Sequence, residues 1–214
     1  MTRTRRDQRG QSSLVEVAAV LIVLTIVMTM LYTSVDSAGR AVAGSSLRVT
    51  NLDEARTLMA VLTKDLRTAT RLQSGTSPFV VADTRDVTFY ANLDDSTGGP
   101  RKIRIYVDTN NEIIASVQTA DAGSVAPDYT YTGPAKLRYV GRYLANTTTE
   151  PVFQYFDDTG TELAAPLSDT DRLAVDSVQI TLIVRAASNL PVGNVTLVDQ
   201  VRLPNVDYQS TAGG

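Results

Sequence analysis

The feature that most constrains this chain is an uncharged, apolar stretch of nineteen residues from Val17 to Val35. A helix rises about 1.5 Å per residue, so this stretch is long enough to cross a hydrocarbon core of about 30 Å. One carboxylate, Glu16, stands at its N-terminal end. An acidic side chain costs about 2.5 to 3.5 kcal/mol at mid-membrane and less near an interface. The sequence therefore predicts a membrane-spanning helix in which Glu16 needs a partner.

The charges on either side of this stretch predict its orientation. The first ten residues carry four arginines and one aspartate, a net charge of +3, and the remaining residues carry −6. Because basic residues stay on the cytoplasmic side, we expect a single-pass protein with its N-terminus inside and everything after Val35 outside. The acidic remainder is not an obvious partner for nucleic acid.

The residue types exclude several kinds of chemistry. The chain holds no Cys and no His, which excludes disulfides, thiolate nucleophiles, imidazole bases and zinc sites built from these residues. Three aspartates, Asp169, Asp171 and Asp176, cluster before a predicted strand, and no nucleophile stands near them in the sequence. We interpret them as turn residues rather than as an acid/base pair. No enzymatic activity and no cofactor are expected.

The N-terminal segment combines a basic leader ending in Gly10, a short polar patch, Glu16 and an uninterrupted apolar helix. In this combination it resembles the class III leader of type IV pilins and pseudopilins. In that family a prepilin peptidase cuts after the glycine, the new N-terminal amine is methylated, and the early glutamate pairs with the amine of a neighbouring subunit. The resemblance implies cleavage after Gly10, Gln11 as the new N-terminus and Glu16 as the assembly residue. The family commonly has an aromatic residue after the cut and glutamate at the fifth mature position, so a cut after Gln11 is the alternative.

The resemblance implies a minor pilin or pseudopilin, a structural subunit of a type IV pilus or a type II secretion-like filament. Its implied partners are the prepilin peptidase, other subunits and the cytoplasmic membrane. The filament's role in adhesion, motility, secretion or DNA uptake stays open. Two other interpretations are a secretory signal cut after Ala41-Val42-Ala43 and a signal-anchored external binding domain that does not polymerise.

The helix is expected to continue beyond the membrane, because no proline occurs before Pro78. Apolar residues then recur at steps of three and four and form a one-sided stripe that should pack on the chain's own domain: Leu52, Ala55, Met59, Leu62, Leu66 and Ala69. This segment is similar to the outer helix of J-type minor pseudopilins. Glycines and serines between Gly39 and Ser46 predict a bend or local unwinding, and the helix should end near Leu72.

From Phe79 the apolar period changes from 3.6 to 2, which predicts antiparallel strands. Strands are expected around 87–91, 103–107, 112–118, 136–145, 152–156, 178–184 and 194–203, with hairpin loops at 108–111 and 157–160. The predicted fold class is α+β, a long N-terminal helix packed on an antiparallel sheet. The predicted organisation is a leader (1–10), a transmembrane and assembly helix (11–35), an amphipathic outer helix and its end (36–77), and an external sheet domain (78–214).

Each of three further sequence patterns can be interpreted either as a binding or modification site or as an ordinary structural feature. Asp94 and Asp95 lie in a glycine-rich loop and would be the first ligands of a calcium site, but the spacing of a calcium loop is missing and a hairpin loop is favoured. Lys136, Arg138 and Arg142 alternate with Tyr139 and Tyr143, which suits single-stranded nucleic acid. A tyrosine-lined core face with a charged outer face explains the same alternation and is favoured. Asn146 and Asn194 begin glycosylation triplets, which we interpret as chance matches.

Overall fold

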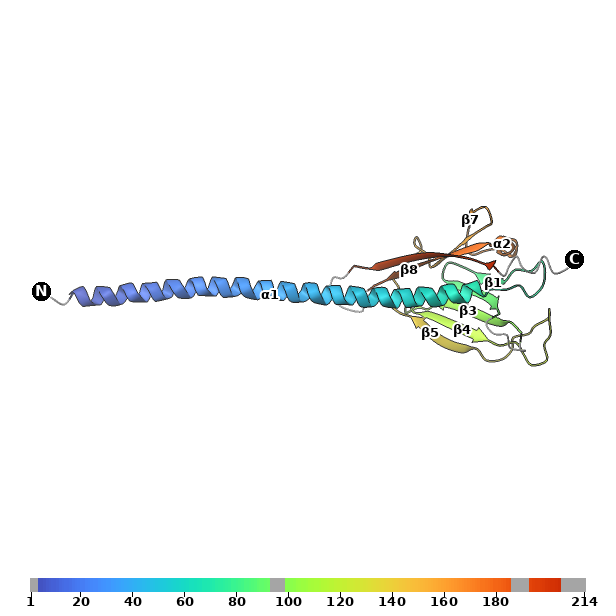
Figure 1. Ribbon diagram of the computed structural model, residues 1–214, viewed down its shortest axis with the longest axis horizontal. Helices are drawn as coiled ribbons and strands as arrows, with labels where there is room; N and C mark the ends of the chain where they lie inside the picture. Colours follow the sequence, from blue (N-terminus) through green and yellow to red (C-terminus); the bar gives the residue numbers. More distant parts are fainter. Residues whose placement is uncertain (1–3, 93–98, 186–192, 205–214) are drawn as a thin grey trace. The chain divides into compact units, whose positions relative to one another are not determined.

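The structure is a computed structural model that describes residues 4–92, 99–185 and 193–204, with side chains from Leu14 onward. Its class is α+β, as predicted (Figure 1): the described residues form one long helix, one short helix and nine strands. The elements are α1 (Thr4–Arg67), β1 (Phe79–Ala82), β2 (Asp86–Ala91), β3 (Arg101–Val107), β4 (Ile113–Gln118), β5 (Lys136–Gly141), β6 (Phe153–Phe156), β7 (Glu162–Leu163), α2 (Asp169–Ala174), β8 (Ser177–Val184) and β9 (Val195–Arg202).

The α1 helix is continuous over 64 residues. The local unwinding expected between Gly39 and Ser46 is absent, because every residue of that section is helical. The cost of about 1 kcal/mol for each interior glycine is smaller than the gain from a helix that already extends on both sides. Contacts within the chain divide it into two units, Met1–Ser46 and Leu47–Gly214.

The helix ends at Arg67, earlier than the predicted Leu72. Directly after it, Ala69 forms an isolated antiparallel bridge with Ala91 at the end of β2. The backbone groups that would have continued the helix therefore pair with a strand, a tertiary contact that local helix signals do not contain.

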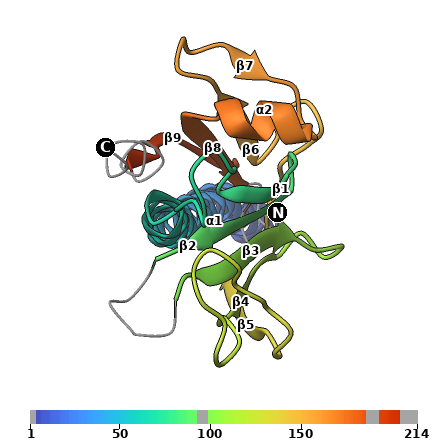
Figure 2. The same cartoon turned by 90° about the vertical axis from the view of Figure 1, so that its right-hand side faces the viewer.

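The strands form two antiparallel sheets rather than the single sheet that was expected. The five-stranded sheet has the order β1-β2-β3-β4-β5, and the four-stranded sheet has the order β7-β6-β8-β9. The chain passes from one sheet to the other after β5, where Leu144 forms an isolated bridge with Val184 of β8. Figure 2 shows the C-terminal part of α1 end-on, with strands of both sheets around it.

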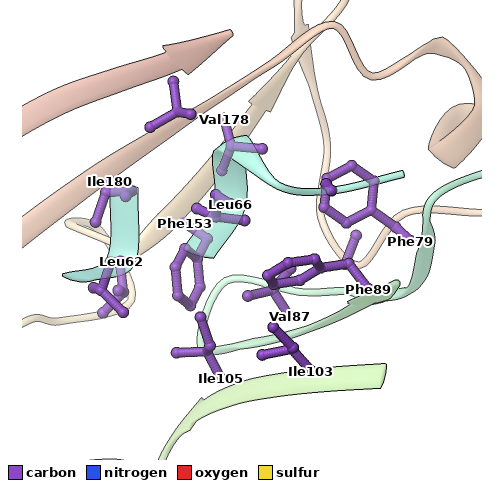
Figure 3. Packing of buried hydrophobic residues seen from close by; sticks show 14 of the residues in the cluster. Leu62, Leu66, Phe79, Val87, Phe89, Ile103, Ile105, Phe153, Val178 and Ile180 are labelled. Carbon is purple, nitrogen blue, oxygen red and sulfur yellow. The ribbon is translucent and has the colours of Figure 1, made fainter. Parts of the chain in front are cut away.

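The core lies where the outer part of α1 meets both sheets. Leu62 and Leu66 of α1 are fully buried, beside Phe89 of the five-stranded sheet and Phe153 and Ile180 of the four-stranded sheet (Figure 3). The predicted stripe is confirmed, since five of its six members are buried and Leu52 is half-buried. Leu58 is also buried, at 2% exposure, although the stripe did not include it.

Both predicted hairpin loops are confirmed and are held by aspartate side chains. A carboxylate oxygen of Asp108 accepts the amides of Asn110 and Glu112 at 2.9 and 2.8 Å. The corresponding oxygen of Asp157 accepts the amides of Thr159 and Thr161 at 3.0 and 2.8 Å. An aspartate that bonds backbone amides two and four residues ahead closes a turn. The short elements β1, β7 and α2 were not among the predicted ranges.

Candidate functional site

The apolar segment of α1 lies uncovered. All fifteen large apolar side chains between Leu14 and Val35 are 45% to 74% exposed. This helix is long and apolar enough, by length and composition, to cross a membrane. Apolar surface of this extent is unfavourable in water, so lipid or other apolar helices must cover it.

Three threonines in this segment satisfy their hydroxyls within the helix itself. Thr25 donates to the carbonyl oxygen of Leu21 at 2.7 Å, and Thr29 donates to that of Thr25 at 2.7 Å. Thr33 donates to the carbonyl oxygen of Met30 at 2.9 Å. A hydroxyl that bonds back to its own helix carries little desolvation cost in a bilayer. These residues are therefore compatible with an apolar environment.

Glu16, by contrast, is an exposed carboxylate among these apolar residues. A carboxylate accepts hydrogen bonds but cannot donate them, so a cationic amine would suit it. Gly10 and Gln11, the predicted processing residues, belong to the helix α1. Their cleavage stays a prediction.

The basic residues around β5 take part in ion pairs. Arg138 contacts Asp65 of α1 at 3.0 Å, and Arg142 contacts Glu112 at 3.4 Å. Two of the three residues considered for nucleic acid are thus partly neutralised within the domain, and Lys136 is the third. Binding of nucleic acid by these residues stays a prediction.

The favoured interpretation of Tyr139 and Tyr143 was wrong. Tyr139 is 64% exposed and does not line the core, and Tyr143 is 40% exposed. Arg138 instead lies on the face of β5 that meets α1, where it pairs with the half-buried carboxylate of Asp65. The expected alternation also does not continue to Tyr143, because the register shifts between the pairs Ile114–Tyr139 and Ile113–Gly141 and β5 ends at Gly141.

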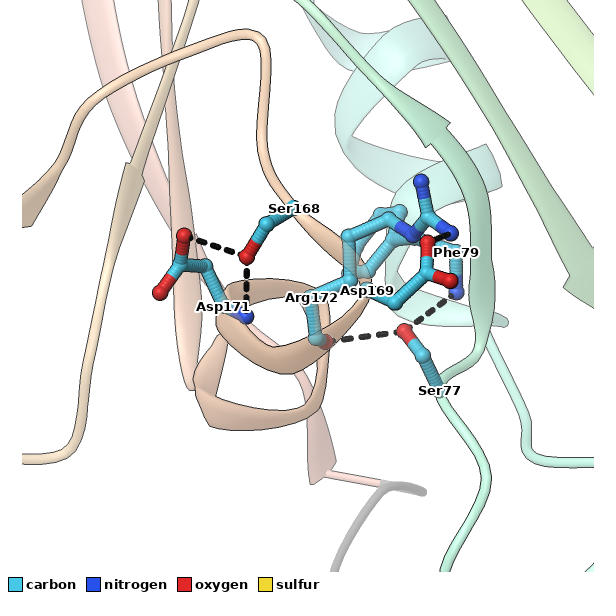
Figure 4. Close-up of polar contacts among 6 residues, drawn as sticks. All are labelled: Ser77, Phe79, Ser168, Asp169, Asp171 and Arg172. Carbon is cyan, nitrogen blue, oxygen red and sulfur yellow. Dashed lines mark hydrogen bonds and ion pairs between the residues drawn. The ribbon is translucent and has the colours of Figure 1, made fainter.

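The aspartates of the 169–176 cluster have structural contacts. The Ser168 hydroxyl accepts the Asp171 amide at 3.2 Å and donates to its carboxylate at 2.7 Å, which caps α2. Asp169 pairs with Arg172, and the carbonyl oxygen of Arg172 accepts the hydroxyl of Ser77 at 2.8 Å (Figure 4). These contacts attach α2 to the segment before β1.

Asp176 pairs with Arg202 of β9 at 3.3 Å. Each of the three aspartates therefore has a partner in a cap or an ion pair. Asp169 and Asp171 lie in the helix α2 rather than in the predicted turn, and Asp176 lies in the connection between α2 and β8. The absence of enzymatic activity stays an expectation.

The two glycosylation triplets differ in accessibility. Asn146 is 8% exposed, and its amide donates to the carbonyl oxygens of Glu150 and Thr181 at 3.0 and 2.8 Å. Its side-chain oxygen accepts the Ile183 amide at 3.0 Å. Asn194 is exposed. Only Asn194 is accessible for attachment of a glycan in the folded domain.

The possible calcium ligands Asp94 and Asp95 lie outside the described residues. Among the residues that the structure describes, no group of three or more Asp or Glu side chains could hold a metal ion.

One feature that the sequence did not reveal is a groove of about 390 Å³ on the outer face of the five-stranded sheet. It is lined by Val80, Val81, Asp86, Thr88, Lys102, Arg104, Ser116, Gln118 and Ala135. The available signal was the alternation of Lys102 and Arg104 with buried isoleucines in β3. That pattern predicts that one face of β3 is polar, but it does not identify which residues of the neighbouring strands lie on the same face.

Comparison with protein families, with curated proteins and with solved structures finds no match to this chain.

Proposed function

We propose that this protein is a minor pilin-like or pseudopilin-like filament subunit. It is processed by a prepilin peptidase, held in the cytoplasmic membrane with its N-terminus inside, and assembled through the apolar part of α1. The external domain is extracytoplasmic or part of a surface filament. The resemblance of the leader, from Gly10 to Glu16, supports this proposal together with the fold class.

The observation that carries the proposal is the contrast in burial along α1. The large apolar side chains between Leu14 and Val35 are at least 45% exposed, whereas Leu62 and Leu66 are fully buried in the domain core. A simple membrane anchor and an assembly helix both require the uncovered part. Glu16 favours the assembly helix, since an anchor gains nothing from a carboxylate in its apolar span.

In this mechanism, packing between helices replaces lipid around residues 14–35. Because lipid is as apolar as the side chains of the helix, the hydrophobic effect does not drive two helices together in a membrane. The favourable free energy comes from close van der Waals contact between their side chains. The attraction between a carboxylate in this environment and a neighbouring cation contributes up to several kcal/mol, and it is stronger the deeper the pair lies in the membrane. The pairing of Glu16 with the N-terminal amine of the next subunit would therefore fix the axial register.

The first test combines a cross-link with a charge substitution. Because the chain has no Cys, a single cysteine at Thr29→Cys reports contact between copies or with a co-expressed subunit. We expect cross-linked species in the processed protein and their loss with Glu16→Ala. Asp36→Ala is the matched control, since Asp36 lies beyond the apolar stretch and pairs with Arg40 of its own helix at 2.8 Å.

The mass of the mature chain gives an independent result. Loss of the first ten residues supports processing by the peptidase, and loss of eleven supports a cut after Gln11. A chain that retains Met1 and still inserts with Glu16→Ala supports the signal-anchored domain that does not polymerise. A chain that starts after Ala43 supports secretion and refutes the proposal.

A further inference from the structure

The groove on the five-stranded sheet is built by side chains that the strand register brings to one face. Thr88 of β2 lies opposite Arg104 of β3, and Arg104 lies opposite Ser116 of β4. The opposite face of the same strands carries Ile103 and Ile105, which are fully buried in the core. The groove is thus an open face supported by a rigid, packed sheet, as a preformed binding site requires.

The charges in the groove leave one cation available. Asp86 accepts three hydrogen bonds from Arg104 at 2.6 to 3.1 Å, and the guanidinium lies 4.4 Å from the ring centre of Tyr106. Arg104 is therefore held in place and largely neutralised. Lys102 has no ion-pair partner within the described part of the chain. Of the described residues that line the groove, Lys102 is therefore the unpaired cation offered to a negative group of a ligand.

Short polar side chains complete the groove. Thr88 is only 4% exposed, and neither its hydroxyl nor that of Ser116 has a hydrogen-bond partner among the residues described. The amide of Gln118 donates to the carbonyl oxygen of Gly133 at 2.8 Å, and its oxygen is a further acceptor. A ligand rich in hydroxyl groups can both donate to and accept from such side chains.

An apolar rim continues the same face toward β5. Leu137 lies opposite Ser116, and Tyr139 lies opposite Ile114. Leu137 and Tyr139 are 65% and 64% exposed. An aliphatic and an aromatic side chain beside a polar groove offer a surface for the carbon-bound hydrogens of a sugar ring.

We infer that this groove binds an acidic saccharide, with the sugar carboxylate on Lys102 and its hydroxyl groups on Thr88, Ser116 and Gln118. A nucleic acid strand fits less well. It needs a row of cations along its phosphates, whereas Asp86 offsets one of the two cations in the groove. The inference goes beyond filament assembly and needs only the folded external domain.

The test is calorimetric titration of the full chain in detergent micelles with trigalacturonic acid. We expect a dissociation constant of about 1 mM or lower and no comparable binding of the neutral trisaccharide maltotriose. Lys102→Gln should weaken binding about tenfold or more, as expected for loss of a charged hydrogen-bond donor. Lys136→Gln is the matched control, because Lys136 lies opposite Val117 on the other face of the sheet.

A second variant, Thr88→Val, keeps the volume and removes the hydroxyl, and it should also weaken binding. Thermal unfolding checks that each variant is folded. The inference is overturned if trigalacturonic acid does not bind, if maltotriose binds equally well, or if Lys136→Gln weakens binding as much as Lys102→Gln. Tighter binding of an oligothymidylate of equal charge overturns it in favour of nucleic acid. None of these results depends on cleavage or assembly, so they leave the filament proposal unaffected.

Discussion

Gly141 of β5 packs directly against Leu58 of α1: a Cβ atom at Gly141 would lie 2.6 Å from Cδ2 and 3.1 Å from Cδ1 of Leu58. Leu58 is 2% exposed, so neighbouring side chains limit its movement. The absence of a side chain at one residue thus allows the edge strand to approach the helix.

Gly141→Ala should destabilise the domain by about 1 to 3 kcal/mol, because overpacking a dense core forces side chains from their preferred rotamers. Chemical denaturation monitored by circular dichroism measures the change. Gly133→Ala is the control, since its nearest neighbour, an Asp121 oxygen, lies 3.9 Å from the added Cβ. Equal stability of the two variants would show that Leu58 moves aside at little cost.

Arg138→Gln should destabilise the domain by about 1 kcal/mol at neutral pH, since it removes the partner of a half-buried carboxylate. Burial raises the pKa of Asp65 above its usual value, and the nearby Arg138 opposes that shift. The contribution of Asp65 to stability is therefore complete below its usual pKa and is lost as the pH rises through the raised pKa. Without Arg138 the pKa of Asp65 should rise further.

The destabilisation by Arg138→Gln should consequently shrink as the pH falls through the raised pKa of Asp65, and it should be smallest below the usual pKa. Urea denaturation at a series of pH values measures this dependence. Arg142→Gln serves as the comparison, because its pair with Glu112 is longer, at 3.4 Å, and should contribute less. An effect of Arg138→Gln that stays constant with pH would contradict the coupling.

Local periodicity predicted most of the fold, because burial of one face leaves a regular pattern in the sequence. The stripe that contains Leu62 and Leu66 and the alternation around Ile103 both match the observed core. What the pattern could not provide is the choice of face where both faces carry amphipathic residues. On β5, Arg138 faces α1 and bonds to Asp65, a residue 73 positions away, and local periodicity does not contain this contact.

The two candidate sites, Glu16 in the apolar helix and the groove on the five-stranded sheet, also differ in how far the sequence alone could predict them. Glu16 could be predicted because a charge within an apolar run is a local anomaly. The groove could not, because Thr88, Lys102 and Ser116 lie on three strands and meet only through the sheet register. A site whose residues are brought together by the strand register can be found only once the structure is known.

Asn146→Ala should destabilise the domain by about 1 to 3 kcal/mol, since it leaves buried backbone groups without partners. Asn146 bonds the chain before β6 to β8 by donating to the carbonyl oxygen of Thr181 and accepting the amide of Ile183. Thermal unfolding measures the loss. Asn194→Ala is the control, because Asn194 is exposed and begins the other glycosylation triplet. Similar unfolding of both variants would mean that the bonds of Asn146 contribute little.

Asp121→Ala should loosen the connection between β4 and β5. In this connection the carboxylate of Asp121 accepts the Thr132 amide at 3.0 Å and the Gly133 amide at 3.2 Å. Bonds from the Thr130 hydroxyl and then from Thr132 lower the pKa of Asp121. Its contribution is therefore present above the usual aspartate pKa and is lost as the pH falls through the lowered value.

Amide hydrogen exchange at Thr132 and Gly133 should thus be faster in Asp121→Ala, and in the unmodified protein these amides should lose protection only in strong acid. Comparison at one pH separates the effect of the variant from the intrinsic dependence of exchange on pH. Asp128→Ala, at an exposed aspartate of the same connection, should leave both amides protected. Fast exchange of both amides in the unmodified protein at neutral pH would show that the carboxylate does not hold the loop.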